Sequence, residues 1–237
     1  MNPYLSVAIH QPNFLPWTGY FLKMALCDIF VFLDDVQFSR KRAARTELIS
    51  RGGKALTISM PVHLPHGFQT TYAQAIPAMS SMTKNKLLNK IKENYLHAPY
   101  FDRIFPIIEM RIRADYKSLS DFNIGLIKDF CVLLKIASEC ITSSELNVLS
   151  QDKNNRNLEI VKKLHGKVYW SGTGALAYNN PAVFEENQIQ LRYAETIREK
   201  LAYIEADELH LSIVHQLFNY GPEDVQKEIS NLRDALR

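Results

Sequence analysis

The chain has 237 residues, of which 46% are hydrophobic and 22% are charged, as is typical of a folded globular protein. Its 28 Lys and Arg residues nearly balance 25 Asp and Glu residues, so the net charge of +3 gives no case for a nucleic-acid partner. The longest apolar run, 29–33, is far shorter than the roughly 18 residues of a membrane span, and the first four residues do not resemble a signal peptide. We therefore expect a cytoplasmic protein without membrane insertion.

The first 33 residues predict a βαβ unit. Residues 5–9 are apolar and β-prone, 10–16 contain two prolines, 19–27 are typical of a short helix, and 29–33 form a continuous apolar strand. Strands that are apolar on both faces are typical of a buried parallel sheet. A third strand is predicted at 55–61, after the turn signal Gly52-Gly53.

The middle of the chain is expected to be helical, and the α/β alternation then resumes. Apolar residues at helical spacing predict helices at 80–94, 101–113 and 119–135. Short strands are predicted at 140–142, 167–170 and 189–193, with helices at 156–164 and 211–218 and an amphipathic tail from 223. Since no linker separates two domains, we expect a single α/β domain over 1–237 with a mainly helical insertion or appendage at about 80–137.

The first candidate site lies where the two leading strands end. His10, Gln11 and Asn13 follow the first strand, and Asp34 and Asp35 follow the second. Adjacent parallel strands would bring these groups to one edge, where open sheets bind ligands. A carboxylate beside His10 would fix its tautomer for general-base catalysis. The alternative is that His10 caps the loop and Asp34 is a turn residue.

Two further segments are candidates for binding a phosphorylated ligand. Arg40, Lys41 and Arg42, with Arg45 close behind, could hold phosphates, although a solvated basic face has the same pattern. The run 171–174, which begins with Ser171, Gly172 and Thr173, could bring backbone amides to an anion if a helix begins near Ala175. That signal is weak, because no complete glycine-rich phosphate motif is present.

No metal site is predicted. His63 and His66 flank a Pro-Gly turn without a convincing third ligand. The three cysteines have no CxxC spacing and lie in apolar or helical patterns, so we expect them to pack in the core. The cofactor, if there is one, is left unknown by the sequence.

Several blocks of the sequence resemble the WbqC-like protein family. They are HQPNFLPW at 10–17, GYF at 19–21, DIFVFLDDVQF at 28–38, APYF at 98–101, SSEL at 143–146, YWSG at 169–172, LSI at 211–213 and LFNYGP at 217–222. Arg45-Thr46 stands where that pattern has an Asn-Arg pair, and His215 stands where it has an acidic residue.

This resemblance implies a role in bacterial surface-polysaccharide biosynthesis, in the O-antigen, capsule or lipopolysaccharide pathways. We expect a transferase that moves an acyl or aminoacyl group onto an amino sugar of a sugar nucleotide, with an acyl or aminoacyl carrier as a possible partner. His10 would be the base oriented by Asp34 or Asp35, Gln11 and Gln37 would bond the sugar, and the cations at 40–42 would hold the diphosphate. The alternative is a non-catalytic accessory protein that binds a sugar nucleotide or a carrier.

A second resemblance concerns architecture alone. The order of strand, proline-rich loop and helix is similar to the HxGH nucleotidylyltransferases, so the expected fold is a Rossmann-like, mostly parallel sheet of the HUP or nucleotidyltransferase type. The corresponding segment is Trp17-Thr18-Gly19-Tyr20 and contains neither histidine. Adenylyl transfer is therefore a third hypothesis, and the oligomeric state is left open by the sequence.

Overall fold

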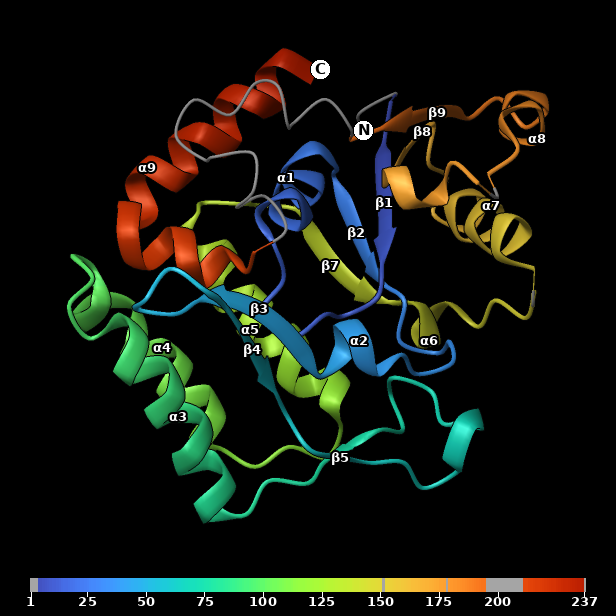
Figure 1. Ribbon diagram of the computed structural model, residues 1–237. Coiled ribbons are helices and arrows are strands. Elements are labelled where there is room, and N and C mark those ends of the chain that lie inside the picture. The colour runs from blue at the N-terminus through green and yellow to red at the C-terminus, as the bar shows by residue number, and fades with distance from the viewer. Residues whose placement is uncertain (1–3, 151, 178, 195–210, 237) are drawn as a thin grey trace.

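A five-stranded parallel sheet forms the centre of the protein (Figure 1). The computed structural model describes residues 4–150, 152–177, 179–194 and 211–236. The strand order across the sheet is β7-β2-β1-β8-β9. The bounds are Ser6–His10 for β1, Ile29–Phe32 for β2, Glu139–Thr142 for β7, Val168–Ser171 for β8 and Gln190–Tyr193 for β9.

The central strands are short, apolar and buried, as predicted. In β1 and β2 most side chains are inaccessible to solvent, and the register pairs Val7 with Ile29 and His10 with Phe32. The connection between these strands is α1 (Thr18–Leu26), so the βαβ unit predicted for the start of the chain is confirmed. Covering both faces of a parallel sheet explains why neither strand alternates between apolar and polar residues.

Helices cover the two faces of the sheet in separate layers. Ala8, Phe30 and Trp170 point toward the core shared with α1 and α9. Val7 and Tyr169 point to the opposite face. That second face is covered by α7 (Lys153–Lys163) and α8 (Pro181–Glu186), and the one-turn α6 (Ser143–Leu146) precedes them.

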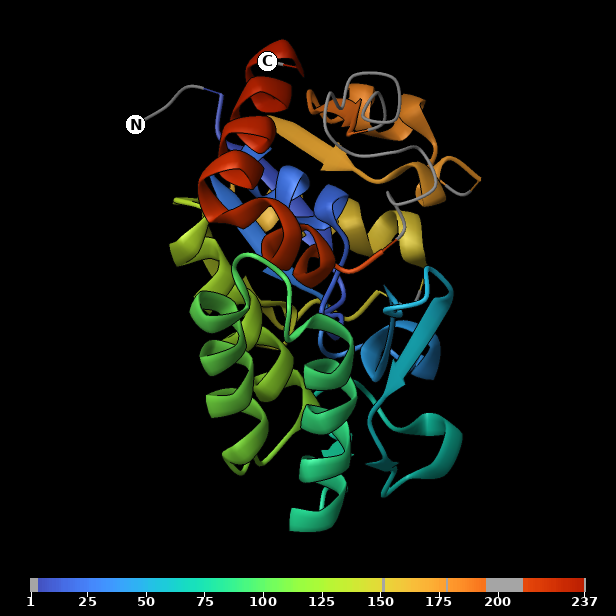
Figure 2. The ribbon, with the colours of Figure 1, turned by 60° about the vertical axis from the view of Figure 1, so that its left-hand side comes forward.

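Three helices between β2 and β7 extend below the sheet (Figure 2). They are α3 (Ser81–Tyr95), α4 (Phe101–Arg113) and α5 (Leu119–Leu133). Ser80 and Ser118 cap α3 and α5, since each side chain accepts a hydrogen bond from an amide three residues later. Their bounds agree with the helices predicted from apolar spacing.

Two small antiparallel hairpins and two helical turns lie between β2 and α3. The turns are α2 (Arg40–Ala43) and the 3-10 turn Gly67–Gln69. Strand β3 (Arg45–Ile49) pairs with β4 (Ala55–Ser59), and β5 (Val62–His63) pairs with β6 (Ile76–Pro77). The strand predicted at 55–61 therefore exists at 55–59, but it pairs with β3 and lies outside the central sheet. The strand β3 was not predicted, because its central threonine and glutamate interrupt the apolar pattern.

The last helical element, α9, runs over Ile213–Leu236 and is broken at Gly221, whose φ of +82° is not helical. The stop that the sequence predicts at this glycine and the following proline is therefore present. The amphipathic tail beyond it forms a second helical segment, which buries Val225 and Ile229. The apolar face of the tail is thus packed on the core that α9 shares with α1.

Candidate functional site

The direction of the chain through the sheet reverses between β1 and β8. From β1 the strands proceed outward through β2 to β7, and the chain then returns to the other side of β1 for β8 and β9. In open parallel sheets this reversal leaves a crevice at the carboxyl ends of the two central strands, where ligands bind. His10 ends β1 and Ser171 ends β8, so both lie at this edge.

The β1–α1 loop (residues 11–17) is anchored to the segment that carries α2. The Asn123 side-chain amide donates to the carbonyls of Pro12 and Ala43, at 2.9 and 2.8 Å. The amide of Phe14 donates to the carbonyl of Arg42 at 2.9 Å. One buried asparagine of α5 therefore holds the loop and α2 at a fixed separation.

The same loop contains a strained residue. Leu15 is fully buried and has a φ of +43°, in the left-handed region that non-glycine residues rarely adopt. Its carbonyl accepts a hydrogen bond from the Thr46 hydroxyl at 2.9 Å, and the next carbonyl, of Pro16, accepts from the Ile213 amide at 2.8 Å. These bonds to β3 and α9 hold the loop in its unusual conformation.

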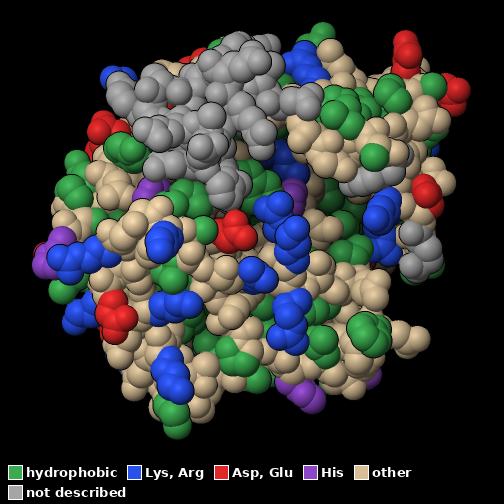
Figure 3. All heavy atoms as spheres, in the orientation of Figure 1, with side chains coloured by type: hydrophobic (Ala, Val, Ile, Leu, Met, Phe, Trp, Pro, Cys, Tyr) green, Lys and Arg blue, Asp and Glu red, His purple; other side chains and the backbone are tan. Residues whose placement is uncertain are grey.

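A cavity of about 680 Å³ opens between this loop and the following basic segment. We call it the basic cavity. It is lined by Asn13, Phe14, Leu15, Pro16, Trp17, Arg40, Lys41, Arg42, Arg45, Thr46 and Glu47. Lys and Arg side chains gather over α2 and β3 beside a hollow in this face of the molecule (Figure 3).

The cations predicted to bind phosphate are all at this cavity. Arg40, Lys41 and Arg42 occupy the one-turn α2, and Arg45 begins β3. The Arg42 guanidinium carbon lies 4.8 Å from the centroid of the Trp17 ring, a cation–π contact that fixes this arginine at the cavity wall. All four side chains are exposed, so an anion in the cavity can reach them.

Asn13 is a buried polar residue of the cavity lining. Its side chain is 2% exposed, and neither its carbonyl oxygen nor its amide nitrogen has a hydrogen-bond partner in the described part of the chain. A buried carboxamide without partners costs free energy that a fold normally avoids. A polar ligand in the cavity could supply the hydrogen bonds that this carboxamide lacks and bind the four cations beside it.

His10 contacts Trp17, a residue of the cavity lining. Its ring is 5.5 Å from the Trp17 ring and 4.9 Å from the Tyr20 ring, both in edge-to-face geometry. Nδ1 lies 3.2 Å from the Gln11 carbonyl oxygen, which selects the tautomer protonated at Nδ1 and leaves Nε2 as the acceptor. Burial first, then the positive charge of Lys23, lowers the pKa of His10 well below its usual value. The imidazole is therefore neutral at neutral pH.

Lys23 was missed by the sequence analysis. It is 4% exposed within α1, and its Nζ donates to the Ile9 carbonyl at 2.8 Å. Burial lowers its pKa to about 7. The available signal was its position, since a lysine between Tyr20 and Met24 falls on the apolar face of an otherwise hydrophobic helix.

The two aspartates that follow β2 bind α6 and α7. Asp34 is 5% exposed, and its carboxylate accepts from both the amide and the hydroxyl of Ser144, at 3.0 and 2.8 Å. Asp35 accepts from the Ser143 hydroxyl at 2.6 Å and pairs with Arg156 at 3.2 Å. Among the described residues neither carboxylate is hydrogen-bonded to His10, so the expected His–Asp pair is not formed.

Gln37 lies away from the basic cavity. Its Nε2 donates to the carbonyl of Phe68 at 2.8 Å, and its backbone forms an isolated antiparallel bridge with Thr71. Gln11, in contrast, stays beside His10, since its carbonyl also accepts a hydrogen bond from the Tyr20 hydroxyl at 2.9 Å. The structure thus groups Gln11 with His10 and places Gln37 against the turn that carries Phe68.

The segment after β8 borders the other side of the crevice. Ser171 is buried, and its Oγ accepts from the side-chain amide of Asn179 at 2.9 Å. Thr173 begins a single 3-10 turn, Thr173–Ala175, so the helix expected near Ala175 is absent and adds no dipole. Gly172 has an ordinary extended φ of −85°, and a Cβ there or at Gly174 would meet no atom of the described residues within 4 Å. Packing against the described part of the chain therefore does not require either glycine.

Comparison with known proteins identifies the family. The model of the WbqC-like protein family matches residues 11–227. The chain belongs to this family. A curated relative, the uncharacterized protein Rv1507c of Mycobacterium tuberculosis, is 26% identical over 221 residues, which cover 92% of this chain and 95% of the relative. No solved structure matches the chain, and none of the described helices is both long and apolar enough to cross a membrane.

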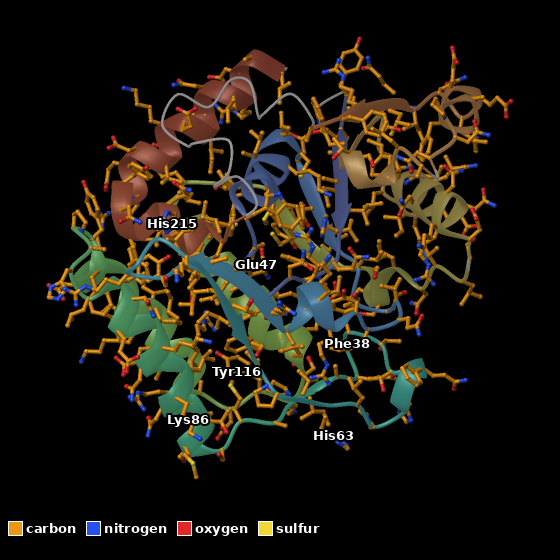
Figure 4. All side chains as sticks on the ribbon, in the orientation of Figure 1. Phe38, Glu47, His63, Lys86, Tyr116 and His215 are labelled. Carbon is orange, nitrogen blue, oxygen red and sulfur yellow. The ribbon has the colours of Figure 1, made fainter. Side chains whose placement is uncertain are left out.

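The sequence blocks that carry the WbqC-like resemblance contact one another in the structure. The amide of Tyr100 donates to the carbonyl of Phe218 at 3.1 Å, which joins the APYF block to the LFNYGP block. Ser143 and Ser144 of the SSEL block donate hydrogen bonds to the two aspartates of the DIFVFLDDVQF block. Strand β3, marked by Glu47, runs beside the beginning of α9, marked by His215, where the Ser212 amide donates to the Glu47 carbonyl (Figure 4). Much of the family signature therefore supports the architecture around the crevice.

Proposed function

We propose that this WbqC-like protein is a transferase of bacterial surface-polysaccharide biosynthesis that binds a sugar nucleotide in the basic cavity. One observation carries the proposal: a cavity of about 680 Å³ between the β1–α1 loop and the segment of α2 and β3 combines four exposed cations with a buried carboxamide that has no hydrogen-bond partner among the described residues. Nucleotide ligands bring both the phosphates and the polar groups that such a lining needs.

The arginines and the lysine are proposed to bind the diphosphate in different ways. Arginine gives bidentate contacts to phosphate oxygens, whereas lysine acts as a point charge. Arg42 is already held on Trp17, so it loses less freedom on binding than Arg40 or Lys41. We therefore assign Arg42 the largest share, with Arg40 and Lys41 adding charge at the open side.

The proposed reaction is transfer of an acyl or aminoacyl group to an amine of the sugar. The amine nitrogen attacks the acyl carbonyl carbon, a C–N bond forms, and the bond from that carbon to the donor breaks with its electron pair leaving on the donor. His10 Nε2 takes the proton that the nitrogen loses, because its Nδ1 is engaged with the Gln11 carbonyl. Gln11, Asn13, Ser171, Gly172 and Thr173 are proposed to contact the sugar and the nucleotide. Asp34 and Asp35 position this edge through α6.

The strand order supports a nucleotide ligand. Counting along the chain, the sheet strands are arranged 3-2-1-4-5, the order of Rossmann-like folds up to their fifth strand. We propose that the fold is of the Rossmann-like HUP or nucleotidyltransferase type, and that the protein works in the cytoplasm on sugar precursors. Fold alone does not assign a reaction, so the proposal depends on the lining of the cavity.

The test is thermal stabilisation by a panel of UDP- and dTDP-sugars, their free nucleotides, and pyrophosphate. A ligand of the folded state raises stability by RT ln(1 + [L]/Kd), so even weak binding registers at high concentration. We expect a sugar nucleotide to raise Tm in the wild type and Arg42→Ala to lose most of the shift. Arg233→Ala, which removes a partly exposed arginine paired with Asp234 on α9, is the matched control. No shift with any member of the panel would contradict the proposal.

A non-catalytic role as a sugar-nucleotide-binding accessory protein is the second candidate. It is favoured by one observation: His10 has no carboxylate partner among the described residues, and its lowered pKa makes it a weak base. Incubating purified protein with a sugar nucleotide and candidate acyl or aminoacyl donors separates the two functions. Product formation that His10→Ala abolishes supports the transferase, and binding without product supports the accessory role.

A further inference from the structure

Lys23 reaches the gap where β1 and β8 separate. Alternate carbonyls of β1 point to opposite neighbours: the Leu5 carbonyl accepts from Val168 of β8, and the His10 carbonyl accepts from Leu33 after β2. By this alternation the Ile9 carbonyl points toward β8, and the β1–β8 pairing ends one residue earlier, at Ala8. Lys23 Nζ donates to that carbonyl at 2.8 Å, so the buried amine lies at the carboxyl end of β1, one residue before His10.

Lys23 forms no ion pair with a described residue. No described carboxylate lies within 4.0 Å of its Nζ, and its aromatic neighbour is the ring of Phe30, 5.9 Å away. A buried ammonium with one carbonyl as its partner is costly, which is why burial lowers the pKa of this lysine to about 7. A neutral donor would satisfy the Ile9 carbonyl equally well, so the hydrogen bond alone does not account for a lysine.

Two titratable groups of the described residues interact with this amine. Cys27, directly after α1, is the nearby thiol, and burial raises its pKa to about 12, so it stays neutral. His10 at the end of β1 is neutral, and the positive charge of Arg42 of α2 also acts on it. The Tyr20 hydroxyl is protonated because burial raises its pKa. The described part of the chain therefore gives the end of β1 positive potential and supplies no counter-ion for Lys23.

We propose that Lys23 is a ligand-binding residue whose protonated side chain is the counter-ion for a phosphate or carboxylate group that enters the crevice beside His10, and that this binding takes up a proton at Lys23. The inference deepens the proposed function, on which it rests, because it assigns an anionic group of the ligand to the crevice in addition to those held by α2. An anion close to a buried amine favours the charged form, so binding and protonation are linked.

Isothermal titration calorimetry at pH 8 tests this inference, with UDP and pyrophosphate as probes. Titrations in two buffers of different ionisation enthalpy give the number of protons taken up per ligand bound. For the wild type we expect uptake approaching about one proton, because the free lysine is mostly neutral at this pH and the bound one is charged. Lys23→Met should bind at least tenfold more weakly and lose the uptake. Lys90→Met is the matched control, since Lys90 Nζ also donates to a backbone carbonyl, of Thr57, on the surface of α3.

The outcomes separate this inference from the proposed function. Binding with equal proton uptake in the wild type and in Lys23→Met, or with none in either, overturns the role of Lys23 and leaves nucleotide binding standing. No binding of either probe by the wild type overturns both. If Lys23→Met does not fold, the ¹³Cε resonances of lysine in the wild type give the same answer. One lysine must titrate near pH 7 in the free protein and move to higher pH with UDP, and an unmoved titration overturns the inference.

Discussion

The carboxylate of Asp34 accepts two hydrogen bonds from Ser144, one from its amide and one from its hydroxyl. The two residues are 110 positions apart in the chain, with the hairpins and helices α3 to α5 between them. This contact joins the end of β2 to the first turn of α6, directly after β7. These buried hydrogen bonds thus hold α6 against the end of β2 at the carboxyl edge of the sheet.

Asp34→Ala should therefore destabilise the protein. The change leaves the amide and hydroxyl of Ser144 without their acceptor, and we expect a loss of about 2–4 kcal/mol in the free energy of unfolding. Ser144→Ala removes one donor and should cost about 1 kcal/mol. Urea unfolding followed by circular dichroism measures both. Loss of turnover in Asp34→Ala with unchanged stability would instead favour direct contact with the substrate.

Lys23→Met should stabilise the unliganded protein. Burial lowers the pKa of Lys23 from 10.5 to about 7, so the unfolded chain binds a proton that the folded protein lacks between these pH values. Stability of the wild type then rises with pH across this window, and below pH 7 the whole penalty, on the order of 4 kcal/mol, is present. Methionine removes the penalty but leaves the Ile9 carbonyl unpaired, so we expect a net gain of about 1–3 kcal/mol at pH 7.5.

The control for this prediction is the pH dependence itself. The stability difference between Lys23→Met and the wild type should shrink from pH 7 to pH 9.5. The lysine must lose a proton when the chain folds, and the free energy of that loss decreases as pH rises. Chemical unfolding at several pH values measures it. A difference that stays constant with pH would show that Lys23 is charged in the folded protein throughout.

The titration of His10 should lie at unusually low pH. Since burial, Lys23 and Arg42 all lower its pKa, the ring stays neutral well below the usual value of 6.5. Folding stability should fall as pH drops below about 6.5, where the unfolded histidine takes up a proton that the folded one excludes. Arg42→Ala should move the pKa upward by removing a positive charge. Two-dimensional NMR of ¹⁵N-labelled histidine measures the pKa of His10 in the wild type and in Arg42→Ala. An unchanged pKa in Arg42→Ala would contradict the assigned proximity of Arg42 to His10.

Gly221→Ala should be strongly destabilising, by about 2–4 kcal/mol. Its φ is +82°, and an added Cβ would lie 2.6 Å from the ring of Tyr100. Gly172→Ala and Gly174→Ala are matched substitutions with no described atom within 4 Å of the added carbon, and we expect their stability to change by less than about 0.5 kcal/mol. The latter two should weaken ligand binding if the ligand approaches this turn. Thermal unfolding with and without the best sugar nucleotide measures all three.

Local patterns predicted the elements that are apolar throughout or regular in period. The first two strands and the helices α3 to α5 have such patterns, and their bounds were obtained closely. Strand β3 was not found, because its side chains are partly exposed and include Thr46 and Glu47. The pairing of β4 with β3 could not be predicted either, because the composition of a strand does not show whether it pairs in a hairpin or in the main sheet.

The candidate site was predicted only in outline. The rule that ligands bind at the carboxyl ends of parallel strands placed His10 correctly at the edge of the sheet, and proximity along the chain placed the cations nearby. The partners of Asp34 and Asp35 lie more than 100 residues away and depend on the path of the intervening helices. The tautomer of His10 and the burial of Lys23 are likewise products of packing, which a single sequence does not specify.

The chain reversal at β1 has a consequence for synthesis on the ribosome. Strand β1 ends at His10, but its neighbour β8 begins only at Val168, so one side of β1 has no partner until most of the chain has been made. An unpaired apolar strand is prone to wrong pairing during that interval. We expect nascent chains that stop before β8 to be protease-sensitive and to bind chaperones, and release of residues 168–171 from the ribosome to be the step that commits the sheet to its native order.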